Sequence, residues 1–597
     1  MPYTAPVEDI KFAMRSIADL DAAIASGDLG DLDGDLVDAV LEEAGRFASE
    51  VVAPLNRIGD EKGASVSDGV VTMPDEWKGV YERWVEAGWG ALAGPESHGG
   101  QALPTLVSVA VSELWNSAAL AFALNPLLTA GAVEAMVAHG SPELQAIYLE
   151  KLVSGAWTGT MNLTEPQAGS DLNALRSRAE RRDDGTYRIF GQKIFITYGE
   201  HELTENIVHM VLARLPDAPP GTRGISLFLV PKYIPDADGN PGVRNDVFCH
   251  SVEEKLGIHA SPTCTMIYGD GKFGDEPGAV GWLIGEENRG LACMFTMMNN
   301  ARLNVAIQGV AVAERAFQHA LAYAHERRQG AAPGHDKGTM APIVAHPDIR
   351  RDLMAMKAMT GAARALCLMT ARAIDLSHRA GGEATREKAG RLAGFLTPLA
   401  KGYATDSAVE VASMGIQVHG GMGFIEETGA AQYLRDARIL PIYEGTNGIQ
   451  AIDFVTRKLP VGDGETAREL IAEFRDIADA LKATNAPEFG NSAARLSEAI
   501  DAAERASAWM LEAIKTDPTT ALAGATAFQR LFAMTAGGAW LAKGALARSK
   551  SGENDAPGRI AVARFYCEQK LTDVPGLATA VTEGAGAVLD TDGVLAG

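Results

Sequence analysis

The spacing of apolar residues changes twice along the chain. From residue 38 to about residue 152, apolar side chains recur at steps of three and four, which is the period of an amphipathic helix. Within this region the Ser141–Pro142 pair is typical of a helix N-terminus. Residues 158–282 instead form short β-branched or aromatic segments divided by Gly and Pro, which indicates strands. Long helical patterns return over residues 290–458.

The order of helices, strands and helices predicts a mainly α protein with a central antiparallel β domain. No alternation of strands with helices is visible, which argues against a Rossmann domain. After Pro460 the stretch VGDGE is typical of a linker, and residues 470–481 place apolar side chains on one helix face. We therefore expect an N-terminal arm at 1–37, an α-helical domain at 38–157, a β domain at 158–282, an α-helical bundle at 283–460 and an additional α-helical domain at 461–597.

The most apolar segment, residues 118–138, is not expected to insert into a membrane. It is interrupted by Asn125 and Pro126 and carries Glu134, so a buried helix hairpin explains it better than a membrane span. The chain has 53 basic and 77 acidic side chains and a net charge of −24. This charge argues against non-specific binding to nucleic acid or to anionic membranes.

The cysteines indicate a reducing compartment. All five are scattered and lack CxxC spacing, which fits buried free thiols better than disulfides. No apolar stretch follows Lys11 and Arg15, so no signal peptide is indicated and we expect a cytoplasmic protein. The twelve histidines form no evident ligand cluster, and no metal site is predicted. The sequence has no P-loop, zinc-protease or serine-hydrolase motif.

Three segments carry residues suited to chemistry. The segment LTEPQAGSD, Leu163–Asp171, offers small residues and hydroxyls that allow a ligand to approach the backbone. QVHGGMGF, Gln417–Phe424, is a glycine cluster, and IYEGTNGIQ, Ile442–Gln450, places a glutamate in an apolar run. Burial would raise the pKa of Glu444 towards a value useful for a general base. Alone, each segment also fits a capped loop, a tight turn or a paired carboxylate.

Together and in this order, the segments resemble the acyl-CoA dehydrogenase family. The likeness covers about residues 40–460 and follows the family patterns L-T-E-x-x-x-G-S-D and Q-x-x-G-G-x-G-F-x-x-E. The chain departs from the family at Asn162, where a small residue is usual, and at Gln432, where a basic residue is usual. The long C-terminal tail resembles a subgroup of the family, and the N-terminal half looks closest to members that act on 3-methylmercaptopropionyl-CoA.

The resemblance implies a bound FAD and a composite cofactor site. Residues that match family contacts with the flavin or its phosphate are Leu163, Thr164, Gly169, Ser170, Phe195, Thr197 and Thr446. Residues that match contacts with the FAD of a neighbouring subunit are Arg327, Gln329, Gln417, Gly420 and Gly421. The resemblance therefore also implies a homo-oligomer, and we expect a homodimer.

The resemblance further implies that Glu444 takes the α-proton of an acyl-CoA thioester while the β-hydride passes to FAD, giving a trans-2-enoyl-CoA. Some relatives carry their base at the position of Ala301, which cannot accept a proton, so Glu444 is the remaining candidate. Gly445, Asn299 and Arg302 match positions that contact or support the bound thioester. The electron acceptor implied by the family is an electron-transfer flavoprotein. An acyl-CoA oxidase that uses oxygen and a non-catalytic flavoprotein scaffold are the alternatives.

Overall fold

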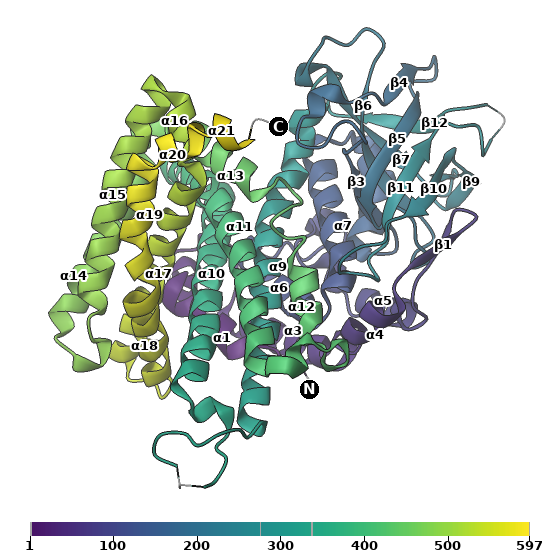
Figure 1. Cartoon of the computed structure of the whole chain (residues 1–597). Coiled ribbons are helices and arrows are strands. Elements are labelled where there is room, and N and C mark those ends of the chain that lie inside the picture. The colour runs from purple at the N-terminus through teal and green to yellow at the C-terminus, as the bar shows by residue number, and fades with distance from the viewer. Residues whose placement is uncertain (1–2, 275, 336–337, 596–597) are drawn as a thin grey trace. The chain divides into compact units, whose positions relative to one another are not determined.

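The computed structural model describes residues 3–274, 276–335 and 338–595, which form two compact units built from discontinuous segments (Figure 1). The first, here called the β unit, comprises Phe47–Pro104 and Ala118–Asn304. The second, here called the helical unit, comprises Met1–Arg46, Thr105–Ser117 and Val305–Gly597. The predicted class, mainly α with a β domain in the middle, is confirmed.

The β unit is organised around an eight-stranded sheet. Its strands are β3 (Thr158–Asn162), β4 (Arg178–Arg181), β5 (Tyr187–Thr197), β6 (Ile207–Arg214), β7 (Ile225–Pro231), β10 (Val247–Val252), β11 (Thr263–Tyr268) and β12 (Ala279–Ile284). Their order is β10-β11-β5-β12-β7-β6-β3, with β4 beside β5 and β6. The small ribbons β1 (Ser65–Ser67) with β2 (Val70–Thr72) and β8 (Tyr233–Pro235) with β9 (Pro241–Arg244) lie outside this sheet.

One feature of the sheet differs from the sequence prediction. The strands pair antiparallel except that β3 runs parallel to β6, and one residue pair joins β4 to β6 in the same sense. Strand β3 follows helix α8 (Pro142–Ser154) in the chain and is the end strand of the order given above. Its direction is therefore not imposed by a hairpin turn, which forces consecutive strands to be antiparallel.

The helices of the β unit are α4 (Leu55–Lys62), α5 (Glu76–Glu86), α7 (Leu120–His139), α8 (Pro142–Ser154) and the first turns of α9 (Gly290–Glu326). The Ser141 hydroxyl accepts a hydrogen bond from the Leu144 N–H at 3.4 Å and Pro142 is the first helical residue, so the predicted cap is confirmed.

The predicted hairpin at residues 118–138 is wrong, because α7 continues as one helix with Pro126 inside it. Among the described residues α7 alone is long and apolar enough to cross a membrane, but 72% of its apolar window is buried within the protein. It packs against β3, α4 and α8. Burial against neighbouring elements of the unit therefore accounts for its apolar sequence, and α7 is a core helix.

The helical unit contains the long bundle helices and the C-terminal extension. Its N-terminal and bundle helices are α1 (Val7–Phe12), α2 (Leu20–Ala25), α3 (Gly34–Phe47), α6 (Thr105–Ala118), the remainder of α9, α10 (Pro347–Arg379), α11 (Glu383–His419), α12 (Ala430–Ala437) and α13 (Asn447–Asp453). The extension contributes α14 (Glu465–Thr484), α15 (Ser492–Thr516), α16 (Pro518–Ala523), α17 (Ala525–Ser551), α18 (Ala556–Phe565), α19 (Val574–Glu583), α20 (Ala585–Leu589) and α21 (Asp592–Leu595).

The extension packs directly onto the bundle through α17, which contacts α10 and α11. Gly537 of α17 approaches α10 so closely that an added Cβ would lie 2.8 Å from the Ala362 Cβ. Phe395 of α11 meets Phe454 and Phe532, with ring centroids 4.9 and 5.2 Å apart. The predicted linker after Pro460 is a short 3-10 turn, so the extension belongs to the same compact unit as the bundle.

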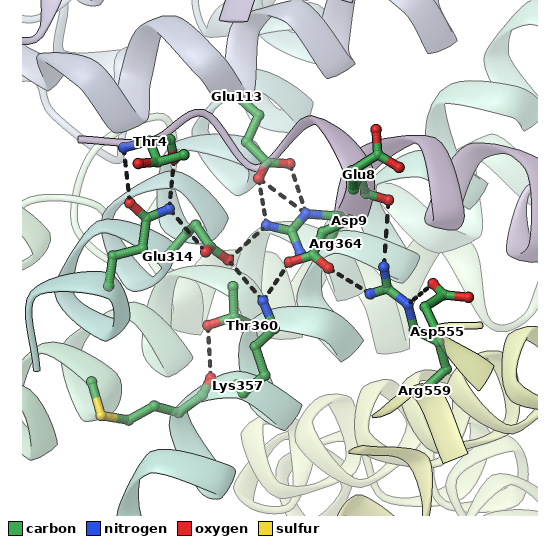
Figure 2. A network of polar contacts seen from close by, with 12 residues as sticks. Thr4, Glu8, Asp9, Glu113, Glu314, Lys357, Thr360, Arg364, Asp555 and Arg559 are labelled. Carbon is green, nitrogen blue, oxygen red and sulfur yellow. Dashed lines mark hydrogen bonds and ion pairs between the residues drawn. The ribbon is translucent and has the colours of Figure 1, made fainter. Parts of the chain in front are cut away.

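A buried network of charges connects distant parts of the helical unit (Figure 2). The Arg364 guanidinium of α10 donates to both carboxylate oxygens of Glu113 on α6, at 2.6–3.0 Å, and to Glu314 on α9 at 3.0 Å. All three side chains are almost fully buried. The network therefore places three of the bundle helices around one cation.

The same network binds the N-terminal arm. The Asp9 carboxylate of α1 lies between Lys357 of α10 and Arg559 of α18, and it pairs with both (Figure 2). Burial alone would raise the pKa of Asp9, but the positive charges of Lys357, Arg364 and Arg559 outweigh it and lower that pKa well below its ordinary value. Asp9 thus joins the arm, the bundle and the extension.

Candidate functional site

Glu444, the predicted base, lies in a turn with a left-handed backbone immediately before α13. It is half-buried, and its φ is +56°, followed by +86° at Gly445. A positive φ is unfavourable for a residue with a Cβ, so the surrounding contacts must hold this conformation. The Thr446 hydroxyl caps α13 by accepting a hydrogen bond from the Ile449 N–H at 3.3 Å.

Buried side chains that the sequence did not identify hold this turn. Lys401 of α11 donates from Nζ to the Gly445 carbonyl at 2.8 Å, and the Gln450 side-chain amide donates to the Glu444 carbonyl at 3.3 Å. Asn447 connects the turn to α11 by further hydrogen bonds. A lysine within the apolar run LTPLAKGYA was the signal in the sequence that could have drawn attention to Lys401.

The predicted glycine loop follows the end of α11. Gln417 is exposed on the last turn of that helix, and Gly420 has a φ of +60°. An added Cβ at Gly420 or Gly421 would meet no atom within 4 Å, so the backbone is open to a ligand at both positions. At Gly423 an added Cβ would lie 2.3 Å from the Ile416 carbonyl, so this glycine is required by packing.

Arg327 and Gln329 lie just after α9 in the helical unit and are exposed. Their backbone is held by hydrogen bonds from the Ile343 N–H to the Arg327 carbonyl at 2.8 Å and from the Gln329 N–H to the Ala341 carbonyl at 2.9 Å. The Arg327 guanidinium donates to the Gln329 side-chain oxygen at 3.3 Å. The two polar side chains therefore lie together on a fixed backbone.

In the β unit, a buried ion pair shapes the loop that carries Thr164. The Glu165 carboxylate accepts from Lys193 Nζ at 2.8 Å and from the Arg176 and Ser177 N–H groups at 2.7 and 3.0 Å. Burial alone would raise the pKa of Glu165, but its partners lower it to about 2, whereas burial lowers the pKa of Lys193 to about 8. Neither residue was singled out from the sequence.

The loop containing Thr164 is also joined to β5, the strand that carries Phe195. Lys193 donates to the Leu163 carbonyl at 3.0 Å, and the Ile194 N–H donates to the Thr164 carbonyl at 2.9 Å. Gly169 and Ser170 follow in the exposed part of the same loop, where an added Cβ at Gly169 would meet nothing within 4 Å. The structure thus brings the two predicted flavin-binding segments of the β unit side by side.

A bulge in β5 presents Phe195 to solvent. Ile194 and Phe195 together lie opposite one residue of β11, and Phe195 has a φ of +61°. Its side chain is 58% exposed, although Thr197, two residues on, is half-buried and paired with Thr263. Bulges commonly redirect a side chain at a functional site. An exposed aromatic ring beside an anchored loop with hydroxyls and an open glycine suits a planar aromatic ligand that carries phosphate.

Asn299 and Arg302 lie in the first turns of α9, within the β unit, and the Arg302 guanidinium donates to the Asn299 side-chain oxygen at 3.4 Å. The next residue along, Asn300, donates to Glu134 of α7. Burial raises the pKa of Glu134 to about 7. Thus α7 anchors the α9 segment that carries the predicted thioester contacts.

The predicted site residues therefore form two sets. The set in the β unit comprises Leu163, Thr164, Gly169, Ser170, Phe195, Thr197, Asn299 and Arg302. The set in the helical unit comprises Arg327, Gln329, Gln417, Gly420, Gly421, Glu444, Gly445 and Thr446. Within each set, exposed or half-buried polar groups are supported by buried hydrogen bonds.

Sequence models of known protein families match consecutive stretches of the chain. They are the acyl-CoA dehydrogenase N-terminal domain at residues 36–156, its middle domain at 160–270 and its C-terminal domain at 288–459. A domain described as acetyl-CoA dehydrogenase C-terminal like matches residues 470–592.

Individual proteins are also similar over most of the chain. The 3-methylmercaptopropionyl-CoA dehydrogenase of Ruegeria pomeroyi is 46% identical over 99% of both chains. A butyryl-CoA dehydrogenase of Syntrophomonas wolfei is 36% identical over 84% of this chain and 82% of its own. The structure of Caenorhabditis elegans ACDH-11 in complex with C11-CoA superimposes with a TM-score of 0.79 at 23% identity, covering 99% of this chain and 96% of the other.

Proposed function

The chain belongs to the acyl-CoA dehydrogenase family and is an FAD-dependent enzyme, and we propose that its substrate is 3-methylmercaptopropionyl-CoA or another short-chain acyl-CoA. The observation that carries the substrate proposal is the 46% identity, over 99% of both chains, to a 3-methylmercaptopropionyl-CoA dehydrogenase. The similarity to a butyryl-CoA dehydrogenase agrees with a short acyl chain.

The residues of the β unit fit the cofactor. Phe195 and Thr197 would lie against the flavin ring, and Thr164 and Ser170 would bind its edge and its phosphate through their hydroxyls. By its match to the family pattern, Thr446 is proposed as a further contact with FAD. When bound, FAD supplies the acceptor for the hydride that leaves the β-carbon.

Glu444 is proposed to hold the proton that leaves the α-carbon. The α-proton of a thioester is weakly acidic, so its removal requires hydrogen bonds to the thioester oxygen, and the backbone N–H of Glu444 is proposed to provide one of them. Asn299, Arg302 and Gly445 are proposed to orient the thioester. The fixed turn would then keep the carboxylate in place with little reorganisation during the reaction.

A panel of acyl-CoA thioesters tests the proposed substrate. With an artificial electron acceptor, we expect kcat/KM for 3-methylmercaptopropionyl-CoA and butyryl-CoA to exceed that for palmitoyl-CoA by at least about 10-fold, because several methylenes each change binding by about 1–3 kcal/mol. A preference for palmitoyl-CoA would contradict the short-chain proposal only. Rapid turnover with oxygen as sole acceptor would instead indicate an acyl-CoA oxidase.

We also propose a cytoplasmic homodimer that passes electrons to an electron-transfer flavoprotein. Arg327, Gln329 and the loop Gln417–Gly421 match segments that in relatives reach the cofactor of the neighbouring subunit. The residues that follow this loop include Met422, Phe424 and Ile425, which are 48%, 84% and 47% exposed, and a group of exposed apolar side chains favours an interface.

Light scattering with an FAD assay tests the dimer. Replacing Arg327 with Glu should lower FAD occupancy and shift the protein towards smaller species together, because a ligand bound at an interface stabilises the associated state. Arg350→Glu makes an equal charge change at an exposed position of α10; it is the control and should alter neither FAD occupancy nor the size of the species. A wild-type monomer with full FAD occupancy is incompatible with a shared site.

A further inference from the structure

Lys401 is a buried cation in the middle of α11. Its side chain is completely inaccessible to solvent. Burying an ammonium group is costly unless hydrogen bonds replace the lost water, and an apolar side chain of the same length would avoid that cost. The groups that hydrogen-bond to Lys401 therefore indicate the role of its buried ammonium group.

Two of those groups belong to the turn that carries Glu444. Lys401 Nζ donates to the Gly445 carbonyl and to Asn447 Oδ1, both at 2.8 Å. Gln450, which is also buried, donates from its side-chain amide to the Glu444 carbonyl at 3.3 Å. Two consecutive carbonyls, those of Glu444 and Gly445, are thus each held by a buried side-chain donor.

These carbonyls belong to the two residues of the turn that have a left-handed backbone. Glu444 has a φ of +56° and Gly445 a φ of +86°. A glutamate in this region relaxes towards a negative φ unless its neighbours prevent it, and that rotation would move its carboxylate. A donor fixed to the carbonyl of the next residue opposes the rotation directly.

Asn447 extends the connection between the turn and α11. Its side-chain amide donates to Asp406 Oδ1 at 2.7 Å and to Thr405 Oγ1 at 2.9 Å, while its oxygen accepts from Lys401. The turn is therefore attached to α11 over residues 401–406, through side chains that are mostly buried.

We propose that Lys401 is a positioning residue for the dehydrogenation, which fixes the left-handed turn so that Glu444 faces the α-carbon of the acyl-CoA. This inference rests on the proposed role of Glu444 as the base. Lys401 does not touch the substrate in this proposal and acts through the Gly445 carbonyl and Asn447.

The test compares Lys401→Met with Lys388→Met. Methionine keeps the length of the side chain and removes the donors, whereas Lys388 lies on the same helix, is exposed, and pairs with Glu469 at 3.0 Å. FAD content, KM and the rate of anaerobic flavin reduction are measured with butyryl-CoA and with its α-deuterated form. The isotope effect reports on proton removal alone.

For Lys401→Met we expect full FAD content, a KM within about threefold of wild type and flavin reduction slowed by about 100-fold, as displacement of a catalytic group by about 1 Å can cause. The α-deuterium isotope effect should increase, because proton removal becomes slower relative to the other steps. Lys388→Met should match wild type. A purely structural role would instead lower FAD content or raise KM and leave the isotope effect unchanged.

A second variant decides the matter if Lys401→Met is insoluble. Asn447→Ala keeps the ammonium and its bond to Gly445 but removes the links from the turn to Thr405 and Asp406. It should slow flavin reduction by roughly 10-fold with the same larger isotope effect. A rate within twofold of wild type, in either soluble and FAD-loaded variant, would overturn the proposal. Full activity of Glu444→Gln would instead refute the base, whatever Lys401 does.

Discussion

Glu444→Gln is expected to retain FAD and to slow flavin reduction by a factor of about 10²–10⁴, the usual contribution of a general base. Glutamine keeps the size of the side chain and its capacity for hydrogen bonding, but it cannot accept the α-proton. The alternative position for a base is Ala301, which is buried in α9 and has no titratable group. The measurement is anaerobic bleaching of the flavin absorbance in a stopped-flow instrument with a good short-chain substrate.

The matched control for this variant is Asp453→Asn. Asp453 ends α13, the helix that follows the base turn, and it pairs with Arg457 at 3.0 Å. The control makes the same carboxylate-to-amide change nearby, and its rate should remain close to that of wild type. If Glu444→Gln bleaches as fast as the control with full FAD content, the base has been assigned wrongly.

Arg364→Met is expected to have the second largest effect, a loss of about 3–5 kcal/mol in the free energy of unfolding. Removing the guanidinium leaves the carboxylates of Glu113 and Glu314 buried without their shared cation. Breaking one side of a buried ion pair costs far more than the pair itself contributes, because the remaining charges are not solvated. Equilibrium denaturation of the FAD-loaded protein, followed by far-UV circular dichroism, measures the loss.

Two comparisons make the Arg364 result specific. Arg351→Met removes an arginine from the same helix, but that side chain is 56% exposed, so it should cost less than about 1 kcal/mol. Adding Glu113→Gln and Glu314→Gln to Arg364→Met removes the two buried carboxylate charges and should recover part of the stability. Equal stability of Arg364→Met and Arg351→Met would show that the buried network does not support the fold.

Features that depend only on residues close together in the sequence were predicted correctly. The periods of three to four and of two distinguish the helical regions from the β region, because each element exposes one side of a regular backbone to the core. The cap at Ser141 and the buried face Leu470–Leu481 of α14 are confirmed for the same reason. The domain limits placed at residues 37, 157, 282 and 460 remain predictions.

The segment 118–138 was misread because tertiary packing outweighs local preference. Pro126 predicts a break, yet α7 continues through it, since the surrounding core buries the whole segment. The stretch after Pro460 is a short 3-10 turn, and small residues on α17 allow the extension to pack closely on the bundle, which the sequence of the turn does not indicate. Neither the continuous helix α7 nor the packing of the extension is determined by the few residues around Pro126 or after Pro460.

The sequence by itself determined the fold class, the family and the identity of the candidate base, because these depend on residue types and their order along the chain. Only the tertiary structure revealed the left-handed backbone of Glu444 and the buried ammonium of Lys401, 44 residues from the carbonyl that it binds. It alone also brought Asp9, Arg364 and Arg559 into one network. Such contacts arise when burial forces distant polar groups to satisfy one another, and no local pattern records which partner each will find.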